Sequence, residues 1–352
     1  MSGIGSILLA LAIFLGGCSS QEDDDPGSLL LDYEGEVPGA AVLVVKDGKA
    51  LLSRGVGLAN MQTGERVTAQ TNFRLASVTK QFTATAILCL VEDRKLTLEE
   101  NLVDIFPGFP EYGRDITVRH LLTHTSGLID YENLIPGSET TQVLDSDVLE
   151  MMKAQTSTYF APGTEYRYSN GAYAVLAMIV EKRSGLSFPE YLHDNIFEPA
   201  GMDNTIAFLN GVNVVENRAR GYTVDGTNIT DSDQSVTSAV LGDGGIYSSI
   251  DDMLAWDSAL YGDGVLSAEM RELAVTPATL DDGSETGYGF GWRIDEYWGH
   301  RRVHHTGSTS GFRTVIRRFP DDRFTVVVLT NRREPSVGGL ADSLTDLYLF
   351  DE

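Results

Sequence analysis

The stretch Ser77-Val78-Thr79-Lys80 decides how this chain is interpreted. Apolar residues recur at helical spacing from Val78 to Arg94, which predicts a mostly buried helix that begins beside Ser77. Residues three apart on a helix share a face, so the Ser77 hydroxyl and the Lys80 amine are expected to lie side by side. A lysine in that position can take the seryl proton, which makes the serine a nucleophile toward carbonyl carbons. The structural alternative is a serine N-cap followed by a solvated lysine in the first turn.

The composition is that of an ordinary globular protein of 352 residues. Hydrophobic residues make up 42% of the chain and aromatic residues 9%, which excludes a disordered protein. The length leaves room for one large domain or for two lobes that share a cleft. The net charge of -25 argues against nucleic acid as a partner, because a phosphate backbone would repel the chain.

The N-terminal residues are expected to be a targeting segment rather than part of the fold. An apolar run over 4–15 has the length of a signal peptide and is too short to cross a bilayer comfortably. It ends in Leu15-Gly16-Gly17-Cys18, which resembles the lipobox of bacterial lipoproteins, where the cysteine is lipidated. The alternative is an uncleaved apolar anchor, and both interpretations place the body outside the cytoplasm and attached to a membrane. We therefore predict a signal peptide over 1–17, lipidation of Cys18, an acidic tether over 18–35 and a folded body over 36–352.

Sequence patterns predict strands near both ends of the chain and helices between them. The predicted strands are 40–46, 50–58, 289–294, 301–304, 313–319 and 323–331, and the predicted helices are 78–94, 172–182, 189–197 and 340–349. This order favours an α+β fold, in which one antiparallel sheet is built from the N- and C-terminal segments and flanked by helices. The α/β lobe is expected over about 36–114 and 246–352, and a mostly helical lobe over about 115–245.

A serine–lysine pair needs a second proton carrier, and Tyr168-Ser169-Asn170 offers one. A phenol needs a nearby cation to act as a base at neutral pH. Lys80 could be that cation, and the two groups would then share one proton network. The segment Tyr131-Glu132-Asn133 has the same letter pattern, but we set it aside because it lacks the Pro-Gly lead-in and the apolar helix that follows. The structural alternative for Tyr168 is an ordinary half-buried aromatic side chain.

A third segment, His305-Thr306-Gly307, follows the strand-like residues 301–304 and precedes Ser308. A small residue at a strand edge lets a substrate backbone pair alongside the strand. The adjacent His304 is an alternative to His305, but strand alternation would turn its side chain to the opposite face. Residues 305–308 are therefore the candidate substrate-binding strand.

The three segments, in this order, resemble those of the serine β-lactamase and penicillin-binding-protein superfamily, specifically its class C β-lactamase and DD-peptidase branch. The resemblance spans about residues 36–350 and includes three further stretches, 120–128 (HLLTHTSGL), 244–253 (GGIYSSIDDM) and 287–292 (GYGFGW). It implies a β-lactamase/transpeptidase-like fold and hydrolysis through an acyl-enzyme, without a cofactor. By resemblance, Ser77 would be the acylated nucleophile, Lys80 its proton acceptor or electrostatic helper, and Tyr168 the general base and acid. The resemblance leaves open which of Lys80 and Tyr168 takes the first proton.

The resemblance also implies which residues bind the substrate. They are Asn170, His305, Thr306, Gly307 and Ser308. Asn170 would hydrogen-bond the substrate or Lys80. The backbone amides of Ser77 and Ser308 would form the oxyanion hole, and His305 and Thr306 would face the substrate's leaving side.

The histidine of the third segment favours peptide, amide or ester substrates over β-lactams. Many β-lactamases have a lysine there, whose fixed charge pairs with the drug's carboxylate, whereas His305 is largely neutral at pH 7. Arg293 could supply the missing charge. We therefore expect a DD-carboxypeptidase-like or esterase-like serine hydrolase acting on a small-molecule or peptide substrate. The alternatives are a β-lactamase and a catalytically silent protein that binds cell-wall peptides.

The sequence predicts neither a metal site nor a reactive thiol. His120 and His124 have the i, i+4 spacing of zinc helices, but Leu121 stands where the catalytic glutamate would be. Cys89 lies in an apolar run, which predicts a buried, small hydrophobic side chain. The oligomeric state is left open.

Overall fold

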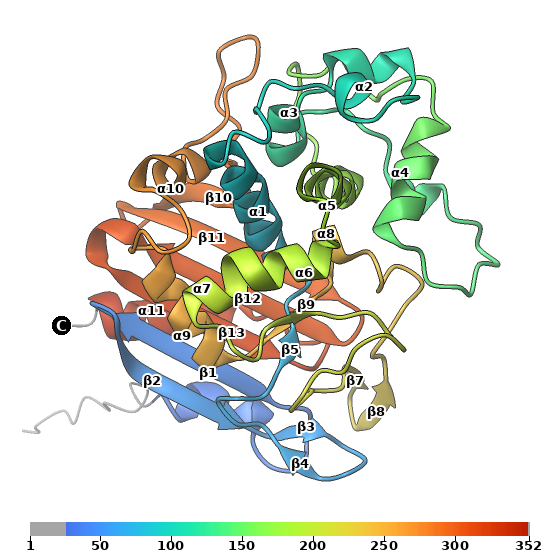
Figure 1. Ribbon diagram of the computed structural model, residues 1–352. Coiled ribbons are helices and arrows are strands. Elements are labelled where there is room, and N and C mark those ends of the chain that lie inside the picture. The colour runs from blue at the N-terminus through green and yellow to red at the C-terminus, as the bar shows by residue number, and fades with distance from the viewer. Residues whose placement is uncertain (1–25, 351–352) are drawn as a thin grey trace, which may run out of the picture.

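The two ends of the chain together build the central sheet. The computed structural model describes residues 26–350, and six strands pair in the order β10-β11-β12-β13-β1-β2. Every neighbouring pair in this sheet is antiparallel. Figure 1 shows the blue N-terminal strands lying beside the red C-terminal ones. The predicted α+β fold, with one antiparallel sheet from both ends of the chain, is therefore confirmed.

The strands β1 (Ala40–Lys46) and β13 (Phe324–Thr330) are buried along almost their whole length. Val42 and Val328 pair across them and point into the core on the α11 side of the sheet. The next residue pair along the two strands points the opposite way, into the larger core around α1. Because side chains alternate along a strand, a sheet that is covered on both faces requires an apolar residue at nearly every position.

The remaining elements complete the main sheet, three small sheets and the helical layers. The other main-sheet strands are β2 (Lys49–Val56), β10 (Arg293–Tyr297), β11 (His300–Thr309) and β12 (Phe312–Phe319). The small sheets are formed by β3 (Leu58–Asn60) with β4 (Glu65–Arg66), by β5 (Phe73–Arg74) with β9 (Ile246–Ser248) and β6 (Ile206–Ala207), and by β7 (Tyr222–Asp225) with β8 (Asn228–Asp231). The α-helices are α1 (Lys80–Glu92), α2 (Leu102–Ile105), α3 (Val118–Leu122), α4 (Asp145–Lys153), α5 (Asn170–Ser184), α6 (Phe188–Leu192), α7 (Glu198–Ala200), α8 (Leu241–Gly244), α9 (Ile250–Ala259), α10 (Ala268–Ala274) and α11 (Gly338–Thr345). The 3-10 segments are η1 (Ser28–Tyr33), η2 (Ala76–Thr79), η3 (Glu111–Asp115), η4 (Tyr131–Asn133) and η6 (Pro320–Asp322), and the π-helical segments are η5 (His193–Phe197) and η7 (Asp346–Phe350).

The helices α1 and α5 are the two central helices, and they bring two of the predicted catalytic segments together. Both are buried around most of their circumference, which is why neither has a strongly one-sided apolar stripe. Ser169 caps the start of α5, because its hydroxyl accepts a hydrogen bond from the amide of Ala172 at 3.1 Å. The cap fixes Asn170 as the first residue of the helix.

The predicted strand over 289–294 is misplaced, since β10 begins at Arg293. The preceding glycines cross over the start of α1 instead of extending the sheet. Gly291 has a φ of 79°, and a Cβ there would stand 2.7 Å from the backbone oxygen of Lys80. Only glycine combines that backbone conformation with such a close approach.

The acidic tether predicted over 18–35 is too long. Residues 28–33 form η1, and within it Leu30 and Tyr33 are 0% and 3% exposed and belong to the core on the α11 side of the sheet. The predicted signal peptide over 1–17 and the lipidation at Cys18 lie outside the described residues. Within residues 26–350, no helix has the length and apolar character needed to cross a bilayer.

A buried ion pair links β12 to α9 and offers a test of the fold's energetics. Arg318 Nε lies 3.3 Å from Asp257 Oδ1, and the two side chains are 4% and 2% exposed. Removing one partner leaves the other charge buried, so Arg318→Met is expected to lower the free energy of unfolding by about 3–5 kcal/mol, measured by urea denaturation. Replacing both residues, with Arg318→Met and Asp257→Leu, should recover most of that loss. A double variant as unstable as the single one would instead implicate lost packing. The exposed pair of Arg66 and Glu36 is the matched control, and Arg66→Met should change stability little.

Candidate active site

Ser77 lies in the 3-10 turn η2, which leads directly into α1. It is the only residue between 71 and 80 that is not buried. Ala76, just before it, has a φ of 50°, a left-handed conformation that costs a non-glycine residue energy. Gly307 lies directly against this turn, and a Cβ there would stand 3.1 Å from the Ala76 Cβ, so the missing side chain makes room for the turn. The strained turn therefore leaves the Ser77 hydroxyl accessible while its surroundings stay packed.

Lys80 is the buried cation of the site, with 0% of the residue exposed. Its Nζ donates to Ser77 Oγ at 3.3 Å, to Asn170 Oδ1 at 2.9 Å and to the backbone oxygen of Asp243 at 2.8 Å. The hydroxyl and the amine that the sequence placed on one face are thus in hydrogen-bond contact. The alternative of a solvated Lys80 is wrong.

Asn170 connects Lys80 to a carboxylate. Its Oδ1 accepts from Lys80, while its Nδ2 donates to Glu132 Oε1 at 2.6 Å. The expected hydrogen bond between Asn170 and Lys80 is therefore present. Glu132 is exposed and belongs to η4, the segment Tyr131-Glu132-Asn133 that sequence reasoning set aside.

Asp243, in α8, contributes a second carboxylate that is only 8% exposed. Its Oδ2 accepts a hydrogen bond from the Tyr131 hydroxyl at 3.0 Å. Burial raises the pKa of Asp243 to about 6, and the positive charge of Lys80 limits that rise. The start of α8 is held by Asp145, whose carboxylate accepts two backbone amide hydrogen bonds there, at 2.7 and 3.0 Å. Burial raises the pKa of Asp145 to about 8.

The Tyr168 side chain meets Lys80 through the face of its ring, and its hydroxyl makes no hydrogen bond to Ser77. The ring centroid is 4.9 Å from Lys80 Nζ, and the His124 ring packs on it at 4.2 Å. The Tyr168 hydroxyl is buried and has no hydrogen-bond partner among residues 26–350. The expected network, in which amine and phenol both touch the serine, is therefore only half present. The attraction between an ammonium and the face of an aromatic ring explains this geometry.

The end of β11 forms one wall of the site. β10 pairs only with residues 300–304 of β11, so in the described part of the chain residues 305–309 have a strand partner on one side only. Along this free edge Thr306 and Ser308 are exposed, whereas Gly307 is buried. A Cβ at Gly307 would stand 2.2 Å from the backbone oxygen of Leu75. Glycine is thus required here because β11 passes directly against the backbone that leads into the nucleophile turn.

His305 does not face the substrate side, which corrects the position expected from the sequence. It is 1% exposed, with Nδ1 2.8 Å from the Thr306 carbonyl oxygen and Nε2 3.0 Å from the Tyr288 hydroxyl. Because a carbonyl only accepts, Nδ1 carries the ring proton and Nε2 accepts from Tyr288. Burial lowers the pKa of His305 well below its usual value, and the charge of Lys80 acts in the same direction. His305 is therefore a neutral, buried support beside Tyr168, with 6.1 Å between the two ring centroids.

His304 points to the opposite face of the strand, as expected. Its Nε2 lies 3.3 Å from Asp295 Oδ2, and burial lowers the pKa of His304 to about 4. Arg293 lies on the Tyr168 side, with its guanidinium carbon 5.6 Å from the centroid of that ring. Among residues 26–350, no carboxylate is within ion-pair distance of Arg293.

A small polar cavity of about 130 Å³ lies beside Ser77. Its lining residues are Arg74, Ala76, Ser77, Tyr131, Glu132, Asn170, Thr237, Asp243, Gly244, Ser308 and Thr309. Sequence reasoning identified Ser77, Asn170 and Ser308 but missed Glu132 and Asp243. The available signals were positional, since Glu132 comes four residues after the 120–128 stretch and Asp243 directly precedes the 244–253 stretch.

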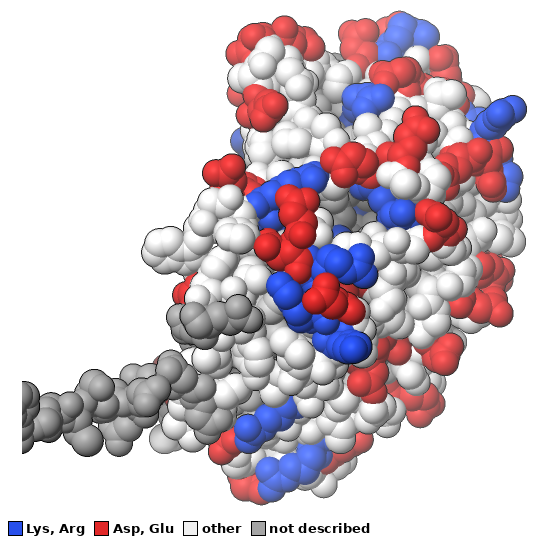
Figure 2. Space-filling model, turned by 90° about the vertical axis from the view of Figure 1, so that its left-hand side faces the viewer, with Lys and Arg blue, Asp and Glu red and all other residues white. Residues whose placement is uncertain are grey.

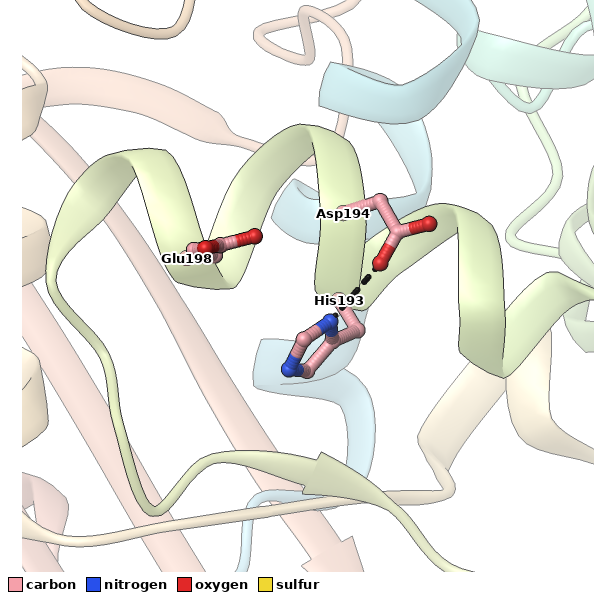
Figure 3. A group of neighbouring side chains, drawn as sticks. All are labelled: His193, Asp194 and Glu198. Carbon is pink, nitrogen blue, oxygen red and sulfur yellow. Dashed lines mark hydrogen bonds and ion pairs between the residues drawn. The ribbon is translucent and has the colours of Figure 1, made fainter.

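The described residues offer little for a metal. His124 Nδ1 accepts from the Ser169 amide and His120 Nδ1 from the Thr117 amide, so both histidines hold backbone turns. His193, Asp194 and Glu198 form an exposed group of potential ligands on the surface segment that runs from η5 into α7 (Figure 3). That group includes none of the residues that line the cavity beside Ser77.

Cys89 is half-buried, whereas the sequence predicted a buried side chain. Desolvation raises the pKa of its thiol to about 12, which makes it a poor nucleophile.

On the face shown in Figure 2, basic side chains are interleaved with acidic ones. Arg302 and Asp295, which pair across β10 and β11, form an ion pair at 2.7 Å. Despite the net charge of -25, the surface is thus locally mixed in sign.

Comparison with known proteins agrees with this geometry. The family model described as Beta-lactamase matches residues 22–349. Penicillin-binding protein 4* of Bacillus subtilis (strain 168) is 34% identical over 308 residues, which cover 83% of this chain and 68% of the relative. A D-aminopeptidase of Brucella anthropi is 32% identical over 303 residues, which cover 85% of this chain and 56% of the relative, so the chain spans little more than half of that protein. The crystal structure of a penicillin-binding protein from Bacillus halodurans superposes with a TM-score of 0.76 at 26% identity, covering 92% of this chain and 98% of that one. The chain therefore belongs to the beta-lactamase family and is a serine hydrolase related to the penicillin-binding proteins.

Proposed function

We propose that this protein hydrolyses short peptides or amides through an acyl-enzyme on Ser77. One observation carries the proposal: a fully buried lysine amine donates to a serine hydroxyl that opens into a polar cavity. This combination suits nucleophilic catalysis, because the amine can assist removal of the hydroxyl proton and the cavity can admit the substrate carbonyl group.

In the proposed reaction the Ser77 oxygen attacks the substrate carbonyl carbon as its O–H bond breaks. The proton passes to the pair formed by Lys80 and Tyr168 and then to the leaving nitrogen, whose bond to the carbonyl carbon breaks. The carbonyl oxygen takes the negative charge, stabilised by the backbone amides of Ser77 and Ser308, two residues that line the cavity. Water then attacks the carbonyl carbon of the acyl-enzyme, the bond from that carbon to Ser77 Oγ breaks, the acid leaves, and a proton from the water restores the Ser77 hydroxyl. The Tyr168 hydroxyl, buried without a partner among the described residues, is suited to passing the proton onward.

The cavity favours an acyl group that carries a free amine. Glu132 Oε1 is occupied by Asn170, but within residues 26–350 no cation lies within ion-pair distance of the Glu132 carboxylate. An ammonium on the α-carbon of the acyl residue would find there a carboxylate acceptor close to the nucleophile. The D-aminopeptidase relative supports this substrate class by its name. A charge-assisted hydrogen bond of this kind contributes about 1.5–3 kcal/mol, or roughly tenfold to hundredfold in kcat/KM.

Carboxypeptidase activity is a second candidate, and Arg293 is the observation that favours it. Its guanidinium lies beside Tyr168 without a protein carboxylate partner among the described residues. It could therefore pair with the terminal carboxylate of a leaving amino acid. An aminopeptidase and a carboxypeptidase both cleave the single peptide bond of a free dipeptide. The two activities can be told apart when either the N-terminus or the C-terminus of the dipeptide is blocked.

Blocking each end of a dipeptide tests the proposal. We expect N-acetylation of D-Ala-D-Ala to lower kcat/KM by tenfold to hundredfold, because the blocked amine cannot pair with Glu132. The variant Glu132→Gln keeps an oxygen that can accept from Asn170 but removes the charge. It should lose activity on the free dipeptide by a similar factor and leave the acetylated one unchanged.

Three other outcomes separate the rival functions. The first outcome is a preference for the acetylated dipeptide over the free one. If that activity is lost when the C-terminus of the dipeptide is amidated, and is also lost in the variant Arg293→Gln, the protein is a carboxypeptidase instead. Fast turnover of penicillin or of a short-chain ester alone would overturn the peptidase assignment in favour of a β-lactamase or an esterase. Absence of both turnover and a covalent adduct, by intact-mass analysis, would indicate a silent binding protein.

A further inference from the structure

A cavity of about 240 Å³ lies among the helices α1 and α10 and the strands β11 and β12. The described residues that line it all differ from those that line the cavity beside Ser77. Its side chains therefore have no part in the reaction proposed at Ser77, and their chemistry can be considered separately.

The wall of this cavity is positively charged, although the chain carries a net charge of -25. Arg271, Arg301 and Arg318 line it, and Glu272 is the single carboxylate among its described lining residues. Positive groups gathered around a hollow attract an anion. The wall therefore indicates an anionic ligand.

Two of the arginines have exposed carboxylates as partners. Arg301 Nη2 lies 3.2 Å from Glu272 Oε1, and Arg271 Nη1 lies 2.9 Å from Asp263 Oδ1. Arg271 also donates to backbone oxygens in the segment 262–266 and so holds that part of the wall. Because both carboxylates are largely exposed, solvent weakens their hold on the arginine charges.

Arg318 offers a buried donor that the fold does not use. The residue is 4% exposed, and its Nε lies 3.3 Å from Asp257 Oδ1. Its Nη2 is buried and has no hydrogen-bond partner among residues 26–350. A buried donor without a partner is costly. An anionic oxygen in the cavity would supply the partner that this nitrogen needs.

The Tyr261 hydroxyl, just after α9, is a second donor of the same kind. It is buried, and the part of the chain that the structure describes gives it no hydrogen-bond partner. Burial raises the pKa of Tyr261, so the hydroxyl keeps its proton and can donate at neutral pH. The guanidinium carbon of Arg318 lies 4.7 Å from the centroid of the Tyr261 ring. Two unpartnered donors thus come from adjacent side chains that both line the cavity.

The rest of the wall determines what kind of anion fits. It includes the apolar side chains of Leu260, Leu266, Val275 and Trp292. A bare phosphate needs polar partners on every side, whereas these side chains suit a ligand with an apolar body. At ~30 Å³ for each water molecule, the cavity has room for about eight waters, or for a ligand of about ten non-hydrogen atoms. Arginine and hydroxyl donors match the oxygens of a carboxylate.

We propose that this cavity binds a small organic carboxylate with an apolar body, whose oxygens accept hydrogen bonds from Arg318 Nη2 and from the Tyr261 hydroxyl. The apolar body would lie against Trp292 and its apolar neighbours. The site is separate from the cavity beside Ser77, so this proposal does not depend on the reaction proposed there.

The probe for the test is phenylacetate, and phenylacetamide is the neutral molecule of the same shape. Isothermal titration calorimetry at neutral pH should show binding of phenylacetate and at least tenfold weaker binding of phenylacetamide, because only the first carries the charge. In protein labelled with ¹⁵N at the tryptophan indoles, phenylacetate should shift the signal of Trp292. The signal of the exposed Trp298, which does not line the cavity, should stay where it is.

Four variants place the binding site. Tyr261→Phe should raise the Kd of phenylacetate about tenfold, since it removes one hydrogen bond to a charged oxygen. Arg318→Lys keeps a charge beside Asp257 but lacks the second nitrogen, and it should raise the Kd at least about tenfold. Tyr191→Phe is the matched control, because the Tyr191 hydroxyl is also buried and unpartnered within residues 26–350 but does not line this cavity. Neither Tyr191→Phe nor Arg293→Gln, which alters an arginine beside Tyr168, should change the Kd.

Each contrary result would overturn the proposal. Absence of binding, or equal binding of phenylacetamide, would remove the carboxylate site. Binding that is lost in Arg293→Gln and kept in Tyr261→Phe would place the anion at the active site instead. Inorganic phosphate that binds more tightly than phenylacetate would contradict the apolar body. Should Arg318→Lys not fold, Tyr261→Phe carries the test, because its hydroxyl makes no hydrogen bond in the described fold.

Discussion

Ser77→Ala is expected to lower kcat/KM for the best peptide substrate by at least about a thousandfold. The variant removes the oxygen that we propose forms the covalent intermediate, so any residual rate would come from binding and the oxyanion hole. Intact-mass analysis after incubation with a penicillin should show an acyl adduct on the wild type and none on the variant.

Ser308→Ala is the matched control for this result, because that hydroxyl lines the same cavity and its residue is assigned a role only through the backbone amide. We expect Ser308→Ala to lose less than tenfold. Ser77 is half-buried, so its truncation should leave the thermal midpoint close to that of the wild type. An adduct that persists on Ser77→Ala would place the nucleophile elsewhere.

The fold was largely predictable because the residues of the central strands themselves show that both faces of those strands are buried. β1 and β13 are continuous apolar runs at opposite ends of the chain, and two such runs have few ways to bury both faces except by pairing. The misplaced strand at 289–294 has a physical cause that no local pattern contains. Gly291 is shaped by its contact with the backbone of α1, more than two hundred residues earlier in the chain.

The site was predictable only where its chemistry is local. Ser77 and Lys80 are three residues apart on one turn, so their contact follows from helix geometry. Asp243 reaches Lys80 across a separation of 163 residues, and in the sequence only its position directly before the 244–253 stretch relates it to the site. Periodicity correctly put His304 and His305 on opposite faces, but it could not say which face opens to solvent. The buried His305 contacts Tyr288, whose hydroxyl lies 3.0 Å from Nε2, and that contact is not visible in the local pattern.

Lys80→Met is expected to separate activity from stability. Loss of the amine removes the group that contacts Ser77 Oγ and carries the site's positive charge, so kcat/KM should fall by about a hundredfold to ten-thousandfold. Stability should change much less than activity. The variant leaves the acceptors on Asn170 and Asp243 without a donor, but it also removes the cost of burying an ammonium, and replacing buried charges by apolar groups is often close to neutral. Steady-state kinetics and thermal melting, measured on the same preparation, check both parts.

The exposed Lys95 is the control, since Lys95→Met removes a surface ion pair and should alter neither quantity measurably. A Lys80→Met variant that keeps more than a tenth of the wild-type kcat/KM would mean that the buried amine is structural. If the variant loses activity because its thermal midpoint is far below that of the wild type, the Lys80 amine holds α1, α5 and α8 together through its three hydrogen bonds. Only a large loss of turnover in a stable protein agrees with a catalytic Lys80.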